Sequence, residues 1–364
     1  MPVRRLPRWS APVAVAVSVL ALGSGLAART GEHAAPSGSV GSPTASSGSA
    51  AALPSTGSLS PAAAPLSTLT PASAPLAAGP GHLTAGRHVS GWPLSPACTS
   101  PGPNPGAAHT PAHDDFAPLR ELGAGLHVRR AYIVRGEDLV PADGLTGVRA
   151  CDAAVWRVVQ AGTPSWLHGR VAELLLFDGD DGGDQGQLLG EVEPGGHDPS
   201  HWRLDLRLDA TGPDELLVTI AHEIGHLISL DRSEVSAPAS DQCPTYDTLT
   251  GCLRPGALLT RFTDQTWSDA TYDAWWRADG VKDEAQRQRQ LDRFYATHRA
   301  QFVTWYAATS PEEDLAETFA YWCVHGPTGG PVGGGQAKLA WLQRDPGLRL
   351  TAGPGCEALQ ALRP

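Results

Sequence analysis

The stretch that decides the fold is TGPDELLVTIAHEIGHLISLD, residues 211–231. Pro213 suits the first position of a helix, and apolar residues then recur at helical spacing. Within this helix His222, Glu223 and His226 have the spacing HExxH. Histidines four residues apart lie on one helical face, so both imidazoles can bind one metal ion, with Glu223 projecting beside it. The stretch therefore predicts a metal-binding helix; the alternative is a pair of ordinary surface histidines.

The residues just before this helix, HWRLDLRLDA (201–210), predict a strand. Apolar and charged side chains alternate along it: Trp202, Leu204, Leu206 and Leu208 against Arg203, Asp205, Arg207 and Asp209. Such alternation is typical of a half-buried strand with one face in solvent. A strand that leads directly into an HExxH helix resembles the arrangement in peptide-cleaving zincins. The strand is therefore a candidate edge that could pair with an extended substrate.

The N-terminal third of the chain has a different composition. A start with three arginines and an apolar run that closes in small residues predict a secretory signal peptide at residues 1–28, cut near Ala27 or Ala28. The alternative is an uncleaved membrane anchor. Residues 29–112 are mostly Ala, Ser, Pro, Gly and Thr. They have too little large apolar surface to offset the entropy of ordering, so we expect a disordered linker or a glycosylated stalk.

The remaining residues, 113–364, are expected to form one strongly acidic domain. They hold 22 of the 27 Lys and Arg and 37 of the 38 Asp and Glu, which leaves a net charge of −15. This charge disfavours binding to nucleic acid or to an anionic membrane. We expect a monomer that is secreted or tethered to the cell surface, with membrane contact only if the N-terminal segment stays uncleaved.

Six cysteines follow the predicted signal peptide, and an even number favours disulfides in an oxidising compartment. No CxxC pair is present, which disfavours a zinc site made of thiolates. Cys243 and Cys252 enclose a short loop, and we expect them to pair. For the other four we take Cys98 with Cys151 and Cys323 with Cys356, a pairing that the sequence alone does not fix.

Other segments complete a coarse secondary-structure prediction. Strands are expected at 127–134 and 172–177, and residues 152–160 fit a short helix or a strand. Further helices are expected at 281–306, 312–324 and 336–344.

Two further features have a plain structural interpretation. The loop from Asp178 to Gly186 resembles a calcium loop only loosely, so a solvated turn is favoured over a calcium site. The tryptophans at 267, 275 and 276 are more typical of core packing than of a ligand platform.

Two histidines leave a catalytic zinc short of one protein ligand. No third histidine follows at the HExxHxxGxxH spacing, so the ligand must come from elsewhere in the chain. Glu313 and Glu317 are four residues apart on the helix expected at 312–324 and share one face. One of them could bind the metal while the other accepts the free ring N–H of a ligand histidine. An acidic helix start is the alternative interpretation, although it does not account for Glu317.

The segment YAATSPEEDLAETF, residues 306–319, resembles the second zinc motif of the group that contains anthrax lethal factor and the Pro-Pro endopeptidases, within the gluzincins. Gly225 in HEIGH also fits the first motif of this group. The resemblance implies Glu313 as the third ligand, Glu317 as support for a ligand and Tyr306 as a hydroxyl that helps to hold the oxyanion. Asp314 is a weaker alternative ligand, because a one-residue change of register would bring it forward.

The chain departs from this family in one respect. The 86 residues between His226 and Glu313 are more than the family usually has, so the loop from Cys243 to Cys252 and the tryptophan patch resemble an insertion. The substrate specificity of the family is therefore not carried over.

The expected fold is α+β and zincin-like: a small mixed sheet with the HExxH helix, followed by a mostly helical C-terminal subdomain. The expected function is a secreted zinc metalloendopeptidase that acts on a peptide or protein, with Glu223 as general base. Two rival hypotheses are a non-cleaving surface adhesion module on the same fold and a zinc hydrolase of cell-wall crosslinks. A protease assay on a mixed peptide library, with and without chelator, separates the expected function from both rivals.

Overall fold

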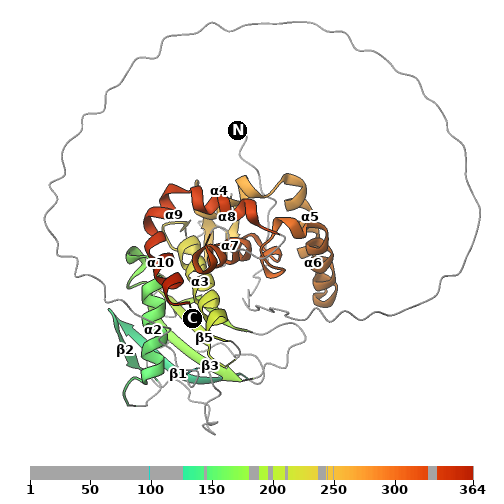
Figure 1. Ribbon diagram of the computed structural model, residues 1–364. Helices are drawn as coiled ribbons and strands as arrows, with labels where there is room; N and C mark the ends of the chain where they lie inside the picture. The colour runs from blue at the N-terminus through green and yellow to red at the C-terminus, as the bar shows by residue number, and fades with distance from the viewer. Residues whose placement is uncertain are drawn as a thin grey trace, which may run out of the picture. The chain divides into compact units, whose positions relative to one another are not determined.

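In the computed structural model, strands from the first half of the described residues form one five-stranded sheet (Figure 1). The strands are β1 (Leu126–Arg135), β2 (Asp138–Pro141), β3 (Val171–Gly179), β4 (Gly190–Pro194) and β5 (Trp202–Arg207). Their order in the sheet is β2-β1-β3-β5-β4. β3 and β5 are parallel, whereas the other neighbouring pairs are antiparallel. The mixed sheet with helices agrees with the α+β prediction.

The structure describes Cys98 and residues 126–142, 146–179, 188–195, 200–209, 212–236, 243, 245–248, 250–326 and 334–363. All of them belong to one unit of the chain. The signal-peptide prediction, the linker prediction apart from Cys98, and the expected loop beyond Gly179 lie outside these residues. Within the described part, no helix is long and apolar enough to cross a membrane.

The prediction that the strand before the HExxH helix has one solvent-facing side is wrong. β5 lies between β3 and β4, and all six of its residues are buried. Arg203 donates to Asp205 Oδ1 over 3.0 Å and also to the Glu193 carboxylate on β4. The charged face is therefore compensated by neighbouring side chains, which is the condition for burying charge. The candidate edge strand is wrong as well, because the edge of the described sheet beside β5 is β4.

Two helices pack on the face of the sheet opposite to Arg203 and Asp205. α2 (Ala150–Gly162) settles the choice left open for residues 152–160 in favour of a helix, and α3 (Pro213–Leu230) is the expected HExxH helix. α3 contacts both β4 and β5, and α2 contacts α3. Apolar side chains from all these elements belong to one core cluster, among them Val155, Val192, Leu204, Leu206, Ile220 and Ile224. The sheet thus supports the helix that carries the two histidines.

The second half of the described chain is mostly helical, as expected. Its helices are α4 (Leu258–Thr266), α5 (Asp269–Asp279), α6 (Glu284–His298), α7 (Pro311–His325), α8 (Gln336–Arg344), α9 (Pro346–Thr351) and α10 (Gly353–Ala361). α7 packs along α3. The helix expected at 281–306 is too long: α6 ends at His298, and two 3-10 turns follow, η2 (Arg299–Gln301) and η3 (Tyr306–Ala308).

All three expected disulfides are present: Cys98–Cys151, Cys243–Cys252 and Cys323–Cys356. The first attaches Cys98 to α2, although this cysteine precedes the expected domain start at residue 113. The second closes a small antiparallel sheet made of β6 (Val235–Ser236), β8 (Gly251–Leu253) and β7 (Asp247–Thr248). The third joins α7 to α10.

The tryptophan patch is part of the core, as expected. Trp267 and Trp275 are buried, and their rings meet edge to face with centroids 6.0 Å apart. Trp276 is half-buried beside Trp275. Trp267 also stacks on Phe294 of α6 at 6.2 Å. The aromatic side chains therefore join α5 and α6 to the segment before α7, and they do not form a separate platform.

Candidate metal centre

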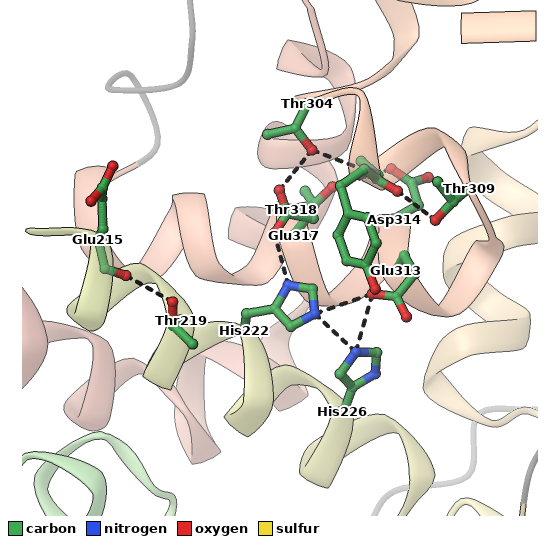
Figure 2. A network of polar contacts seen from close by, with 12 residues as sticks. Glu215, Thr219, His222, His226, Thr304, Thr309, Glu313, Asp314, Glu317 and Thr318 are labelled. Carbon is green, nitrogen blue, oxygen red and sulfur yellow. Dashed lines mark hydrogen bonds and ion pairs between the residues drawn. The ribbon is translucent and has the colours of Figure 1, made fainter. Parts of the chain in front are cut away.

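The first half of the centre is built on α3. Pro213 starts this helix, and the Glu215 carboxylate accepts the Gly212 N–H over 3.0 Å, which caps the first turn. His222 and His226 follow on one face, one turn apart, with their ring centroids 4.7 Å apart. Figure 2 shows both rings directed from α3 toward α7.

The second half is built on the start of α7. Ser310 caps this helix by accepting the Glu313 N–H on its hydroxyl over 3.1 Å, and Pro311 takes the first helical position. The cap places Glu313 in the first turn and Glu317 one turn later on the same face. Both side chains are buried, with exposed fractions of 3 % and 0 %. The sequence pattern Ser-Pro-Glu-Glu therefore determines which carboxylate is directed toward α3.

A glycine lets the two helices approach each other closely. A Cβ atom on Gly225, which lies between His222 and His226, would stand only 2.9 Å from the Ala316 backbone Cα. Any larger residue at position 225 would push α7 away from α3. The glycine of HEIGH and the alanine before Glu317 therefore bring the ligand-bearing helices together.

Three ligand atoms converge at this contact. The Nε2 atoms of His222 and His226 are 3.0 Å apart, and they lie 3.1 and 3.3 Å from Glu313 Oε2. A tetrahedral ion with bonds of about 2.0–2.1 Å holds its ligand atoms about 3.3 Å apart. The observed separations fit such an ion, and this buried group could hold a metal ion. His222, His226 and Glu313 are thus brought together as expected.

A hydrogen bond sets which nitrogen of His222 faces the centre. Its Nδ1 lies 2.8 Å from Glu317 Oε1, and a carboxylate can only accept, so Nδ1 carries the proton (Figure 2). The Nε2 lone pair of the neutral ring is then free for a metal ion, as for histidine ligands held by a carboxylate. Burial alone would lower the pKa of His222, but the carboxylates of Glu313 and Glu317 raise it well above its ordinary value. Conversely, the two imidazoles hold the pKa of Glu313 below its usual range despite burial.

Glu223 lies beside the three ligands without joining them. Its exposed fraction is 2 %, and its Oε2 has no hydrogen-bond partner in the described structure. The side chain rests against the edge strand β4, where a Cβ atom on Gly190 would stand 2.8 Å from Glu223 Oε1. Burial raises the pKa of Glu223 to about 8, with Glu313 adding to the rise and His222 opposing it. A carboxylate with this pKa can take up a proton near neutral pH.

Tyr306 lies next to the His222 ring. The two ring centroids are 5.7 Å apart, and the Glu313 carboxylate lies close enough to affect the tyrosine hydroxyl. Burial and the carboxylates of Glu313, Glu223 and Glu317 raise the pKa of Tyr306 well above its ordinary value. The hydroxyl therefore stays protonated and can donate a hydrogen bond into the centre.

The weaker alternative ligand, Asp314, is directed away from the centre. It accepts hydrogen bonds from Trp267 Nε1 over 2.6 Å and from Lys338 Nζ. The helix register that places Glu313 toward α3 turns the next side chain toward α8. Asp314 is therefore not among the three residues that converge.

Three neighbours of the centre were not identified from the sequence. Thr304 donates to Glu317 Oε2 over 2.6 Å, Lys338 neutralises Asp314, and Gly190 leaves room for Glu223. Thr304 lies inside a segment expected to be helical, and Lys338 lies in a short helix that looks solvent-exposed. None of the three belongs to a local motif, so only the tertiary contacts identify them.

Comparisons with protein-family models, curated proteins and solved structures return no match for this chain. The resemblance to the lethal factor group rests on its two short motifs and stays a prediction.

Proposed function

We propose that this chain is a zinc-dependent endopeptidase. The observation that carries the proposal is the position of Glu223, a buried carboxylate with an unpartnered oxygen beside the two imidazoles and the carboxylate of Glu313. A site that only stores or senses a metal ion has no need of such a group, whereas hydrolysis needs a base next to the ion. The three disulfides favour an oxidising, extracytoplasmic setting for this activity.

Zinc is the metal that the donor set favours. Two imidazoles and one carboxylate in a tetrahedral arrangement, with one position left over, make up a common catalytic zinc site. Calcium and magnesium prefer oxygen donors, which disfavours both ions here. When bound, zinc would supply a Lewis acid and lower the pKa of an attacking water.

Residues of the chain would transfer the proton, stabilise the oxyanion and orient a metal ligand. Glu223 takes the proton of the attacking water on its unpartnered oxygen and passes it to the leaving amine. The raised pKa of its carboxyl group suits this exchange near neutral pH. Tyr306, which keeps its proton, donates a hydrogen bond to the developing oxyanion. Glu317 holds His222 in the tautomer that leaves Nε2 free.

β4 replaces β5 as the strand that would pair with substrate. It forms the sheet edge next to β5, and its first residue, Gly190, lies against Glu223. An extended peptide added antiparallel or parallel to this edge would run past the general base. This placement favours an endopeptidase that binds substrate on both sides of the cleaved bond.

The test is cleavage of a mixed peptide library by the full-length protein, followed by mass spectrometry. We expect cleavage that is lost with a chelator and restored by added Zn²⁺. Glu223→Gln is expected to lower kcat by about 10²–10⁴-fold, as for removal of a general base, while zinc content stays unchanged. Glu215→Gln, on the same helix but at its capped start, is the matched control and should keep its activity.

A protein that binds zinc tightly and cleaves no member of the library would contradict the proposal. It would favour the non-cleaving adhesion module. Turnover by Glu223→Gln at the rate of the unaltered protein would instead remove Glu223 from its role.

A further inference from the structure

Thr304 connects two parts of the centre that lie on different elements. It precedes η3, the turn that carries Tyr306, and its hydroxyl oxygen accepts the Ala307 N–H over 2.9 Å. The same hydroxyl donates to Glu317 Oε2 on α7 over 2.6 Å (Figure 2). One side chain therefore touches both the turn behind the proposed oxyanion donor and the carboxylate behind a metal ligand.

The direction of these hydrogen bonds is fixed by chemistry. The Ala307 N–H can only donate, and a carboxylate can only accept. The single hydroxyl hydrogen of Thr304 must therefore be directed at Glu317. Glu317 receives this hydrogen on one oxygen and the Nδ1–H of His222 on the other. Ala307 thus donates to Thr304, Thr304 donates to Glu317, and Glu317 also accepts the Nδ1–H of His222.

Burial makes both donors to Glu317 important. The exposed fraction of Glu317 is 0 %, so water cannot replace a lost donor. Two charge-assisted hydrogen bonds, one to each oxygen, fix the orientation of a buried carboxylate, whereas a single donor leaves the second oxygen unpaired. Rotation of this carboxylate would weaken its hydrogen bond to His222 Nδ1, and the ring would then hold its Nε2 atom less firmly toward the centre.

We propose that Thr304 is a positioning residue that orients His222 for metal binding and, through the Ala307 N–H, holds the turn of Tyr306 in place. This inference rests on the proposed function only for the role of Tyr306. The effect on the metal ion needs no catalytic activity and can be measured separately.

The test uses Thr304→Val, which keeps the shape of the side chain and removes its hydroxyl, and Thr304→Ser, which keeps the hydroxyl. Zinc affinity of the full-length protein is measured by competition with a chromogenic chelator. Thr304→Val is expected to bind Zn²⁺ about 10-fold more weakly, at the lower end of the range for loss of a group that supports a ligand. Thr304→Ser should bind Zn²⁺ like the unaltered protein.

Thr309→Val is the matched control. The Thr309 hydroxyl donates to the Tyr306 carbonyl oxygen over 2.8 Å, so it belongs to the same turn but does not touch Glu317. We expect this variant to keep its zinc affinity and to lose part of kcat. Thr304→Val should show both a lower zinc affinity and a lower kcat. Its KM should change little, because neither contact of Thr304 involves substrate.

The outcomes are distinguishable. Zinc affinity of Thr304→Val equal to that of the unaltered protein would overturn the inference, and so would a Thr304→Ser variant as weak as Thr304→Val. Circular dichroism of each variant identifies any that fails to fold. If the unaltered protein binds zinc but cleaves no peptide, the proposed function fails, while the affinity measurements still decide the role of Thr304.

Discussion

Glu313 and Asp314 are adjacent carboxylates on α7 with opposite surroundings. Both are buried, with exposed fractions of 3 % and 0 %. Asp314 faces the ammonium of Lys338, which itself lies 3.8 Å from the centroid of the Phe302 ring, and it also accepts the indole N–H of Trp267. Glu313 faces two imidazoles, and no lysine or arginine of the described residues forms an ion pair with it.

The contrast indicates which of the two carboxylates needs a bound cation. Asp314 is neutralised by a residue of the chain, so its site is complete without a ligand. Glu313 is neutralised only when an imidazole is protonated or a metal ion is present. Because the carboxylates of Glu313 and Glu317 raise the pKa of His222, we expect a proton to take this place in the metal-free chain. Four experiments test this contrast.

The largest effect is expected from Lys338→Met. The substitution leaves the Asp314 charge buried without its cation, which destabilises folded proteins by about 3–5 kcal/mol. Urea unfolding of the metal-free protein measures the loss. The double variant Lys338→Met with Asp314→Leu removes both charges and should recover most of it. A double variant as unstable as the single one would show that Lys338 acts through packing on Phe302 instead.

Glu313→Gln is expected to weaken zinc binding by more than about 100-fold, beyond the range seen when only a supporting hydrogen bond is lost. The amide oxygen is a poor ligand and carries no charge to balance the ion. Stability of the metal-free protein should change little in comparison with Lys338→Met. Equilibrium dialysis gives the affinity.

Glu312→Gln is the control for Glu313→Gln. The Glu312 carboxylate accepts the Tyr246 hydroxyl over 2.6 Å and lies outside the ligand group, so zinc affinity should be unchanged. Equal losses in both variants would mean that total negative charge, and not ligation, holds the ion.

Gly225→Ala is expected to lower both the stability of the protein and its zinc affinity, by intermediate amounts. The added methyl group would press on the Ala316 backbone, and overpacking of this kind costs about 1–3 kcal/mol. Because the methyl group also moves α7 from α3, zinc affinity should fall together with stability. Thermal unfolding with and without Zn²⁺ measures both. Gly353→Ala, where a Cβ atom meets nothing within 4 Å, should leave both unchanged.

The smallest effect is a proton count. Since Glu313 and Glu317 raise the pKa of His222, we expect zinc to displace a proton from this ring in the metal-free chain. We expect release of about one proton on zinc binding at pH 7 and a decline in that number as the pH rises through the raised pKa. Calorimetry in buffers of different ionisation enthalpy gives the count. A binding enthalpy independent of buffer would contradict the protonated state.

The helix α3 and its two histidines could be predicted from the sequence because their information is local. Pro213 marks the start of the helix, and the HExxH spacing fixes the face that carries the rings. Glu313 and Glu317 were accessible for the same reason, since Ser310 and Pro311 set their register. Here the local pattern agrees with the tertiary structure.

The burial of β5 could not be predicted, because alternation of polar and apolar residues does not show what lies opposite. Arg203 and Asp205 look like a solvated face until Glu193 of β4 is placed beside them. The partners Thr304–Glu317 and Lys338–Asp314 are likewise 13 and 24 residues apart. Such pairings depend on how strands, turns and helices pack together, which no local pattern records.

The contact between Gly225 and Ala316 makes the distance between the metal ligands independent of the length of chain between the two helices. The span of the centre is set where two backbones touch, so it does not depend on the 86 residues that intervene. The entropic cost of a longer loop grows only slowly with its length. The length of the segment between the two helices can therefore change while the distance between the ligands stays the same.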